Sequence, residues 1–255
     1  MKSKEKMTAK FIMLIATSSG RLSLLVFVFF LFMGPLGIVN IELTNTMVLI
    51  WNGTLSMAFF LQHSGQIRRS FRIFLSKIIK PHYIDSVFTI VSSIVLVLVV
   101  VFWQSTTIVL LELGGFSRII ARIIFFSAIA GLGWGVYSLK SFDPFGRIPI
   151  KAYLNGKPSQ TQAFEVYGPY RWVRHPLYFF VLILIWSCPD LTIDRLLFNG
   201  LWTVWVYIGT LLEERDLLSD FGEKYGEYQR EVPMLIPWKI PMRRTSECVQ
   251  KKGCQ

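Results

Sequence analysis

Apolar runs long enough to cross a lipid bilayer recur along this 255-residue chain, in which 53% of the residues are hydrophobic. Because a membrane-spanning helix needs about 20 consecutive apolar residues, we read spans at roughly 22–39, 43–63, 86–111 and 118–140. Two further runs, at roughly 176–188 and 192–212, form a C-terminal helical hairpin. The first of this pair has only about 13 residues and either crosses thinned membrane or enters it tilted and partly buried. The sequence predicts an all-α polytopic membrane protein with about five to six transmembrane helices.

The formal net charge of +11 suggests a nucleic-acid partner, but the placement of the charges argues against one. Lysine and arginine gather before the first span and in the second and fourth connections, whereas the other connections are mainly acidic. This alternation follows the positive-inside rule and puts both termini and the 141–175 loop in the cytoplasm. We therefore expect an integral, multi-pass membrane protein with the lipid bilayer as its partner and no nucleic acid.

Four regions follow from this pattern: a basic cytoplasmic N-terminus (1–21), transmembrane helices (22–140), a polar loop with the hairpin (141–238) and a polar tail (239–255). Proline and glycine punctuate the loop from 141 to 174, which predicts a structured loop rather than a helix. The aromatic spacing over 221–228 suits a short interfacial helix. The three cysteines show no metal-ligand spacing, so no metal is expected.

Two polar clusters stand out against this apolar background: Arg-His-Pro-Leu-Tyr at 174–178, and the Glu213-Glu214 pair at the end of the returning helix. Pro176 suits the first position of a helix and leaves His175 near its N-cap. Tyr178 then lies on the same face as His175. Adjacent glutamates on a helix point about 100° apart, so at most one of the pair faces the partner helix squarely. Cations at one helix start and carboxylates at the other helix end can enclose a zwitterionic or cationic ligand.

Each cluster also has a simpler explanation. Arginine and histidine at a membrane boundary often only anchor a helix among lipid headgroups. His63, within the Gln62-His63-Ser64 triplet, is either such an anchor or a base that removes a proton from a thiol, as its ordinary pKa near 6.5 would allow.

The Arg-His-Pro-Leu-Tyr segment, the Glu-Glu pair and the segments 221–228 and 232–237 together resemble the integral-membrane methyltransferases, which include isoprenylcysteine carboxyl methyltransferase. The resemblance implies S-adenosyl-L-methionine as methyl donor, held between the start of the helix at Pro176 and the glutamate of the last span. It implies cofactor contacts from six residues: Tyr170, His175, Pro176, Leu177, Tyr178 and Glu213. It also suggests a covering segment: Gln162, Ala163, Phe164 and Glu165.

Shorter segments look like the methanethiol S-methyltransferase and NnrU-like branch: 62–64, 102–104, 142–146 and 212–217. Relatives that methylate a prenylcysteine carboxylate carry an arginine about one turn before the glutamate, where this chain has Gly209. Without that charge partner, a carboxylate acceptor is disfavoured.

These inferences predict methyl transfer from S-adenosyl-L-methionine to a small, lipophilic thiol such as methanethiol, giving a thioether, with His63 as the catalytic base. One alternative is methylation of a prenylcysteine carboxylate, a lipid or an amine. A non-enzymatic alternative is a small membrane transporter or accessory protein.

Overall fold

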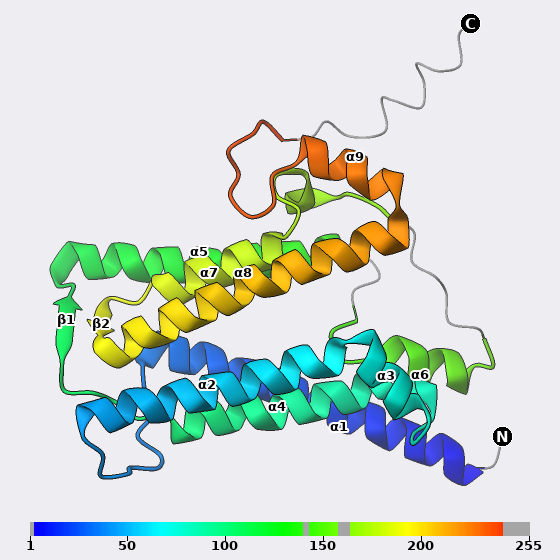
Figure 1. Ribbon diagram of the computed structural model, residues 1–255, viewed down its shortest axis with the longest axis horizontal. Helices are drawn as coiled ribbons and strands as arrows, with labels where there is room; N and C mark the ends of the chain where they lie inside the picture. Colours follow the sequence, from blue (N-terminus) through cyan, green and yellow to red (C-terminus); the bar gives the residue numbers. More distant parts are fainter. Residues whose placement is uncertain (1–2, 140–142, 158–163, 242–255) are drawn as a thin grey trace, which may run out of the picture.

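The computed structural model describes residues 3–139, 143–157 and 164–241, which form a bundle of helices in two layers (Figure 1). One layer contains α1 (Ser3–Met33), α2 (Asn45–Ile67) and α4 (Ile84–Phe102), and the other contains α5 (Gly115–Ser138), α7 (Pro176–Trp186) and α8 (Ile193–Phe221). Helix α2 packs against both α4 and α8 and so joins the two layers.

Short elements close the two ends of the bundle. Helices α3 (Arg69–Ser76), α6 (Arg147–Leu154) and α9 (Glu223–Glu231) lie at the end where α1 begins (Figure 1). Two 3-10 turns, η1 (Pro81–Tyr83) and η2 (Gly168–Arg171), precede α4 and α7. Strands β1 (Val109–Glu112) and β2 (Asp190–Thr192) form an antiparallel pair at the other end, with Leu111 opposite Leu191.

The predicted all-α polytopic membrane fold is confirmed. Among the described residues, α1, α4, α5 and α8 are long and apolar enough to cross a membrane, and α7 is an apolar helix of only 11 residues. Several boundaries differ from the sequence prediction: among them, α1 ends at Met33 rather than near residue 39, and α8 continues to Phe221 rather than ending near residue 212. Helix α1 begins at Ser3 rather than near residue 22, and its first half packs on the protein, since Ala9 and Ala16 are buried and Glu5 binds Lys80. The third span ends at Phe102, and the 141–174 region contains the short helix α6.

Stacked aromatic rings from three helices fill the core between the layers. The Trp202 ring of α8 lies 5.0 Å from that of Phe27 in α1 and 5.2 Å from that of Phe59 in α2, measured between centroids. Phe198, one turn earlier on α8, stacks on Trp202 at 4.7 Å. These contacts bury large apolar surfaces and hold α8 against the other layer.

Two arginines near the end of the bundle that holds the strands bind the last carbonyls of α1. Arg195 donates to the carbonyl of Leu31 at 2.8 Å, and Arg122 donates to that of Phe32 at 2.6 Å. The final carbonyls of a helix have no intrahelical donors, and cations also complement the negative end of the helix dipole. Both arginines therefore stabilise the helix end.

Helix α7 approaches α5 closely because α5 presents glycines along one face. A Cβ atom on Gly131 would lie 2.3 Å from the Phe180 ring, and one on Gly135 would lie 2.6 Å from a methyl carbon of Leu177. Small residues four positions apart allow such close helix packing in membranes. This packing fixes the first turn of α7, on which the polar cluster is built.

Candidate active site

The start of α7 is fixed from outside by the segment that follows α9. Pro176 occupies the first helical position and His175 is the N-cap, as predicted. The backbone amides of Arg174 and His175 donate to the carbonyls of Pro233 and Met234 at 2.9 and 3.1 Å. The chain after α9 therefore holds the helix start in place.

Glu214 of α8 is the centre of a buried polar network. Its carboxylate accepts two hydrogen bonds of 2.8 Å from the Arg174 guanidinium and lies 2.6 Å from Nε2 of His175. From α9, the Tyr225 hydroxyl and the Gln229 amide donate to it at 2.7 and 2.6 Å. Burial, together with the hydrogen bond to this carboxylate, raises the pKa of Tyr225, so its phenol remains a donor. The network joins α7, α8 and α9 into one rigid unit.

Glu213 points elsewhere, although it is the next residue on the helix. Its side chain is 44% exposed, compared with 9% for Glu214. One Glu213 carboxylate oxygen lies 3.7 Å from Nδ1 of His175, and the Tyr178 hydroxyl is also close. Burial, and secondarily the charge of Glu213, raises the pKa of Tyr170, which keeps that phenol neutral. Glu213 is therefore a carboxylate that remains accessible to a ligand.

A first cavity of about 400 Å³ lies beside this carboxylate. It is enclosed by α8, by α9 and by the segment that precedes α7. Its volume falls within the range of small-molecule sites. Aromatic rings and a few polar groups line it, among them Phe164, Tyr170, His175, Tyr178 and Glu213. Phe164 also packs on the Tyr225 ring. The cavity can therefore hold an aromatic group and a cation together.

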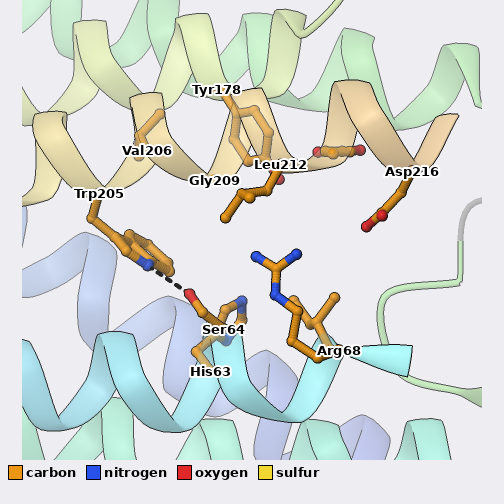
Figure 2. Close-up of a pocket in the computed structure, with 11 residues that line it drawn as sticks. His63, Ser64, Arg68, Tyr178, Trp205, Val206, Gly209, Leu212 and Asp216 are labelled. Atoms are coloured by element: carbon orange, nitrogen blue, oxygen red, sulfur yellow. Dashed lines mark hydrogen bonds between the residues drawn. The ribbon is translucent and has the colours of Figure 1, made fainter. Parts of the chain in front are cut away.

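A second cavity of about 300 Å³ lies between the end of α2 and α8 (Figure 2). His63 lines it and packs among the rings of Phe59, Phe88 and Trp205 in tilted and edge-on contacts. The Nδ1 atom of His63 is buried and has no hydrogen-bond partner among the residues that the structure describes. Ser64 accepts a 3.0 Å hydrogen bond from Trp205, which ties α2 to α8 at this point (Figure 2).

The two cavities share a wall made of Tyr178 and Glu213, which line both. This juxtaposition brings an aromatic cavity next to a second one in which His63 lies among apolar side chains, with charged residues also in its lining. Molecules bound in the two cavities would meet at these two side chains.

The sequence of this chain is similar to those of several curated proteins. It is 35% identical to the methanethiol S-methyltransferase of Crocosphaera subtropica over 198 residues, which are 76% of each chain. The corresponding protein of Mycobacterium tuberculosis is 31% identical over 192 residues (73% of this chain, 76% of the relative). That of Pseudomonas deceptionensis is 32% identical over 185 residues (70% and 69%). The chain belongs to the methanethiol S-methyltransferase family. No protein-family model and no solved structure matches it.

In this family member, most of the predicted cofactor residues come together. Phe164, Glu165, Tyr170, His175, Leu177, Tyr178 and Glu213 all line the first cavity. Pro176 is buried in the first turn of α7 and is not among the lining residues. Gln162 and Ala163 lie outside the described residues. His63 lines the second cavity rather than the first.

The sequence did not predict two features of this member of the methanethiol S-methyltransferase family. The sequence analysis assigned no role to Glu214 by itself, yet this residue binds Arg174 and two residues of α9. Gly209 lines the second cavity, with open space where a side chain would be. Arg68, at the end of α2, lines the same cavity and brings a cation to it. The absence of a cation at position 209 therefore does not leave the cavity without one. The basic residues that follow Gln62-His63-Ser64 in the sequence could have indicated this cation.

Proposed function

We propose that this protein transfers a methyl group from S-adenosyl-L-methionine to a small thiol, giving a thioether. The observation that carries the proposal is the pair of cavities that meet at Tyr178 and Glu213. The relatives are methanethiol S-methyltransferases by name, which supports the same proposal. A donor site and an acceptor site with a common wall are what direct transfer between two bound molecules requires.

The residues of the first cavity fit the proposed methyl donor. The donor has an aromatic base, hydroxyl groups and a positively charged sulfur, and the cavity offers aromatic rings, neutral phenols and the Glu213 carboxylate. Phe164 and Tyr170 would contact the apolar and hydroxyl parts, and Glu213 would face positive charge. When bound, S-adenosyl-L-methionine supplies an electrophilic methyl group on sulfur.

The chain's own residues would position and shield the reacting groups. The Glu214 network holds His175 and Arg174 at the start of α7 and so fixes the neighbouring Tyr178. The stacked rings of His175 and Tyr178, 5.7 Å apart, form one face of the donor cavity. A wall that is fixed before the reactants arrive favours the aligned geometry that transfer requires.

His63 would accept the acceptor's proton. A thiolate is the nucleophilic form of a thiol, and the His63 side chain lines the acceptor cavity. The proton would pass from the thiol sulfur to this imidazole, leaving the sulfur electron pair free to bond carbon. The aromatic rings around His63 would keep bulk water away.

The donor cavity would open on the cytoplasmic side. The start of α1, α3, α6 and α9 lie at the same end of the bundle (Figure 1). Basic residues are concentrated at this end, among them Arg69, Arg72, Lys77 and Lys80. The positive-inside rule then places this end, and with it the supply of a soluble donor, in the cytoplasm.

The test is to identify the product formed by purified protein with methyl-labelled S-adenosyl-L-methionine and separate acceptors: methanethiol, prenylcysteine, a lipid extract and an amine. We expect labelled dimethyl sulfide from methanethiol. A methyl ester of prenylcysteine without any labelled thioether would replace the proposal with carboxyl methylation. The absence of both a product and saturable donor binding would support a transporter or accessory protein.

A further inference from the structure

A pair of opposite charges lies at the mouth of the acceptor cavity. Arg68 is the C-cap of α2, and Asp216 lies on α8, three residues after Glu213. Both line the cavity, and both also line a more open groove toward α3. Figure 2 shows the Arg68 guanidinium extending from α2 toward α8, and Asp216 on the facing helix.

Neither charged group has an ion-pair partner among the residues that the structure describes. Two other arginines of the same end are paired: Arg72 binds Asp85 at 2.6 Å, and Arg174 binds Glu214 at 2.8 Å. Arg69 and Asp220 in the outer groove, like Arg68 and Asp216, have no ion-pair partner among the described residues. No nitrogen–oxygen contact of 4.0 Å or less joins Arg68 to Asp216, although both face the same cavity. Two opposite charges held apart across an opening can bind a ligand that carries both signs.

The cavity is also larger than its smallest proposed acceptor needs. Methanethiol has two heavy atoms, whereas the cavity has a volume of about 300 Å³, far more than a molecule of that size fills. The inner walls are apolar, with Trp205, Val206 and Leu212 around His63. An acceptor that fills this space would have a short apolar stem inside and a polar head at the mouth.

Resting on the proposed function, we infer that the acceptor site also takes thiols that carry an α-amino acid head. The carboxylate binds Arg68, the ammonium binds Asp216, and the sulfur lies inside near His63. Arg68 follows His63 by five residues, which is about 7.5 Å along a helix and within reach of a stem of a few atoms plus the long arginine side chain. The acceptor loses its S–H proton to His63 and gains the methyl carbon, and the donor becomes a neutral thioether.

The charges favour a zwitterion over an acceptor with a single charge. A simple carboxylate would pair with Arg68 but would also meet Asp216 and Glu213 in the same cavity. A simple ammonium would pair with Asp216 and meet Arg68. Like-charge contacts of this kind discriminate against a ligand even when one good contact is present.

The test measures kcat/KM of the purified full-length protein with four thiols: methanethiol, homocysteine, 3-mercaptopropionate and cysteamine. We expect homocysteine to exceed both singly charged thiols by about tenfold. Each of the variants Arg68→Gln and Asp216→Asn should lower the ratio of kcat/KM for homocysteine to kcat/KM for methanethiol by about tenfold, because the KM for homocysteine rises. This is the effect expected for the loss of one charge-assisted hydrogen bond. Arg69→Gln and Asp220→Asn are matched controls, because these residues line only the outer groove; they should leave the ratio unchanged.

The outcomes separate the two proposals. Methanethiol turnover without homocysteine turnover overturns this inference and leaves the proposed function intact. No methylation of any thiol overturns the proposed function itself. If Arg68→Gln and Asp216→Asn lower all acceptors equally, the pair contacts headgroups or supports the fold, and the inference is again wrong. Donor affinity and thermal unfolding of each variant show whether it is folded.

Discussion

Glu213 and Glu214 are adjacent on α8, yet their carboxylates face different surroundings. Glu214 is buried and binds side chains of α7 and α9, whereas Glu213 is half-exposed in the wall shared by two cavities. The angle of about 100° between neighbouring residues on a helix explains the division. One glutamate builds the site, and the other is available to a ligand.

The first prediction concerns stability. Glu214→Ala leaves the Arg174 guanidinium without its carboxylate in a largely buried position, and breaking such a pair costs about 3–5 kcal/mol. We expect a clear loss of thermal stability in detergent. Glu213→Ala is the matched control and should unfold near the wild-type temperature, because Glu213 is half-exposed. Equal destabilisation by both changes would contradict the assignment of Glu214 as the structural residue.

The second prediction concerns the acceptor side. His63→Ala should lower thiol turnover by about 10²–10⁴-fold, the usual contribution of a positioned acid–base group. The deficit should shrink as the pH rises toward the pKa of the acceptor thiol, because more thiolate then forms without help. Turnover of methanethiol across this pH range measures the effect. A deficit that stays constant with pH would argue that His63 only packs against the surrounding rings.

A third prediction tests the packing of α5 on α7. Gly131→Ala would place a methyl group against the Phe180 ring, and overpacking of this kind costs about 1–3 kcal/mol. Gly133→Ala, on the same helix with nothing within 4 Å of its Cβ position, should be neutral or slightly stabilising. Thermal unfolding of the two variants in the same detergent gives the comparison. If Gly133→Ala is the more damaging change, the proposed helix contact is wrong.

A fourth prediction is topological. Engineered cysteines at Lys157 and Asp190, in a background without the native cysteines, should be labelled from opposite sides of the membrane. Lys157 follows α6, and Asp190 begins β2 at the other end of the bundle. A membrane-impermeant thiol reagent on intact cells and on inverted vesicles makes the measurement. Labelling of Lys157→Cys from outside the cell would put the donor cavity on the external side, away from the cytoplasmic donor, and would contradict the proposed orientation.

Local sequence signals predicted the local geometry well. Pro176 placed the start of α7, and helix periodicity placed His175 and Tyr178 on one face, where their rings stack. The end of the third span at Phe102 was missed because it depends on distant partners. Gln104 ends the apolar run: its backbone exchanges two hydrogen bonds with the Asn52 side chain of α2, and its side-chain amide donates to the carbonyl of Val39.

The chemistry of the site depended on contacts that spacing does not encode. Arg68 is distant in sequence from Gly209 and Glu213, so reading α8 by itself suggested a cavity without a cation. The division of roles between Glu213 and Glu214 likewise depends on where α9 folds back. Helix periodicity predicted that the two side chains would point in different directions. Which of them is buried depends on the positions of Tyr225 and Gln229, which bind Glu214.

The central claim is that donor and acceptor occupy separate cavities that meet at Glu213. Calorimetric affinity for S-adenosyl-L-methionine, measured in Glu213→Gln and His63→Ala, tests it most directly. We predict that Glu213→Gln weakens binding by roughly tenfold to a hundredfold, the value of one charged hydrogen bond, and that His63→Ala leaves the affinity unchanged. Unchanged affinity in Glu213→Gln, together with a large loss in His63→Ala, would contradict the account.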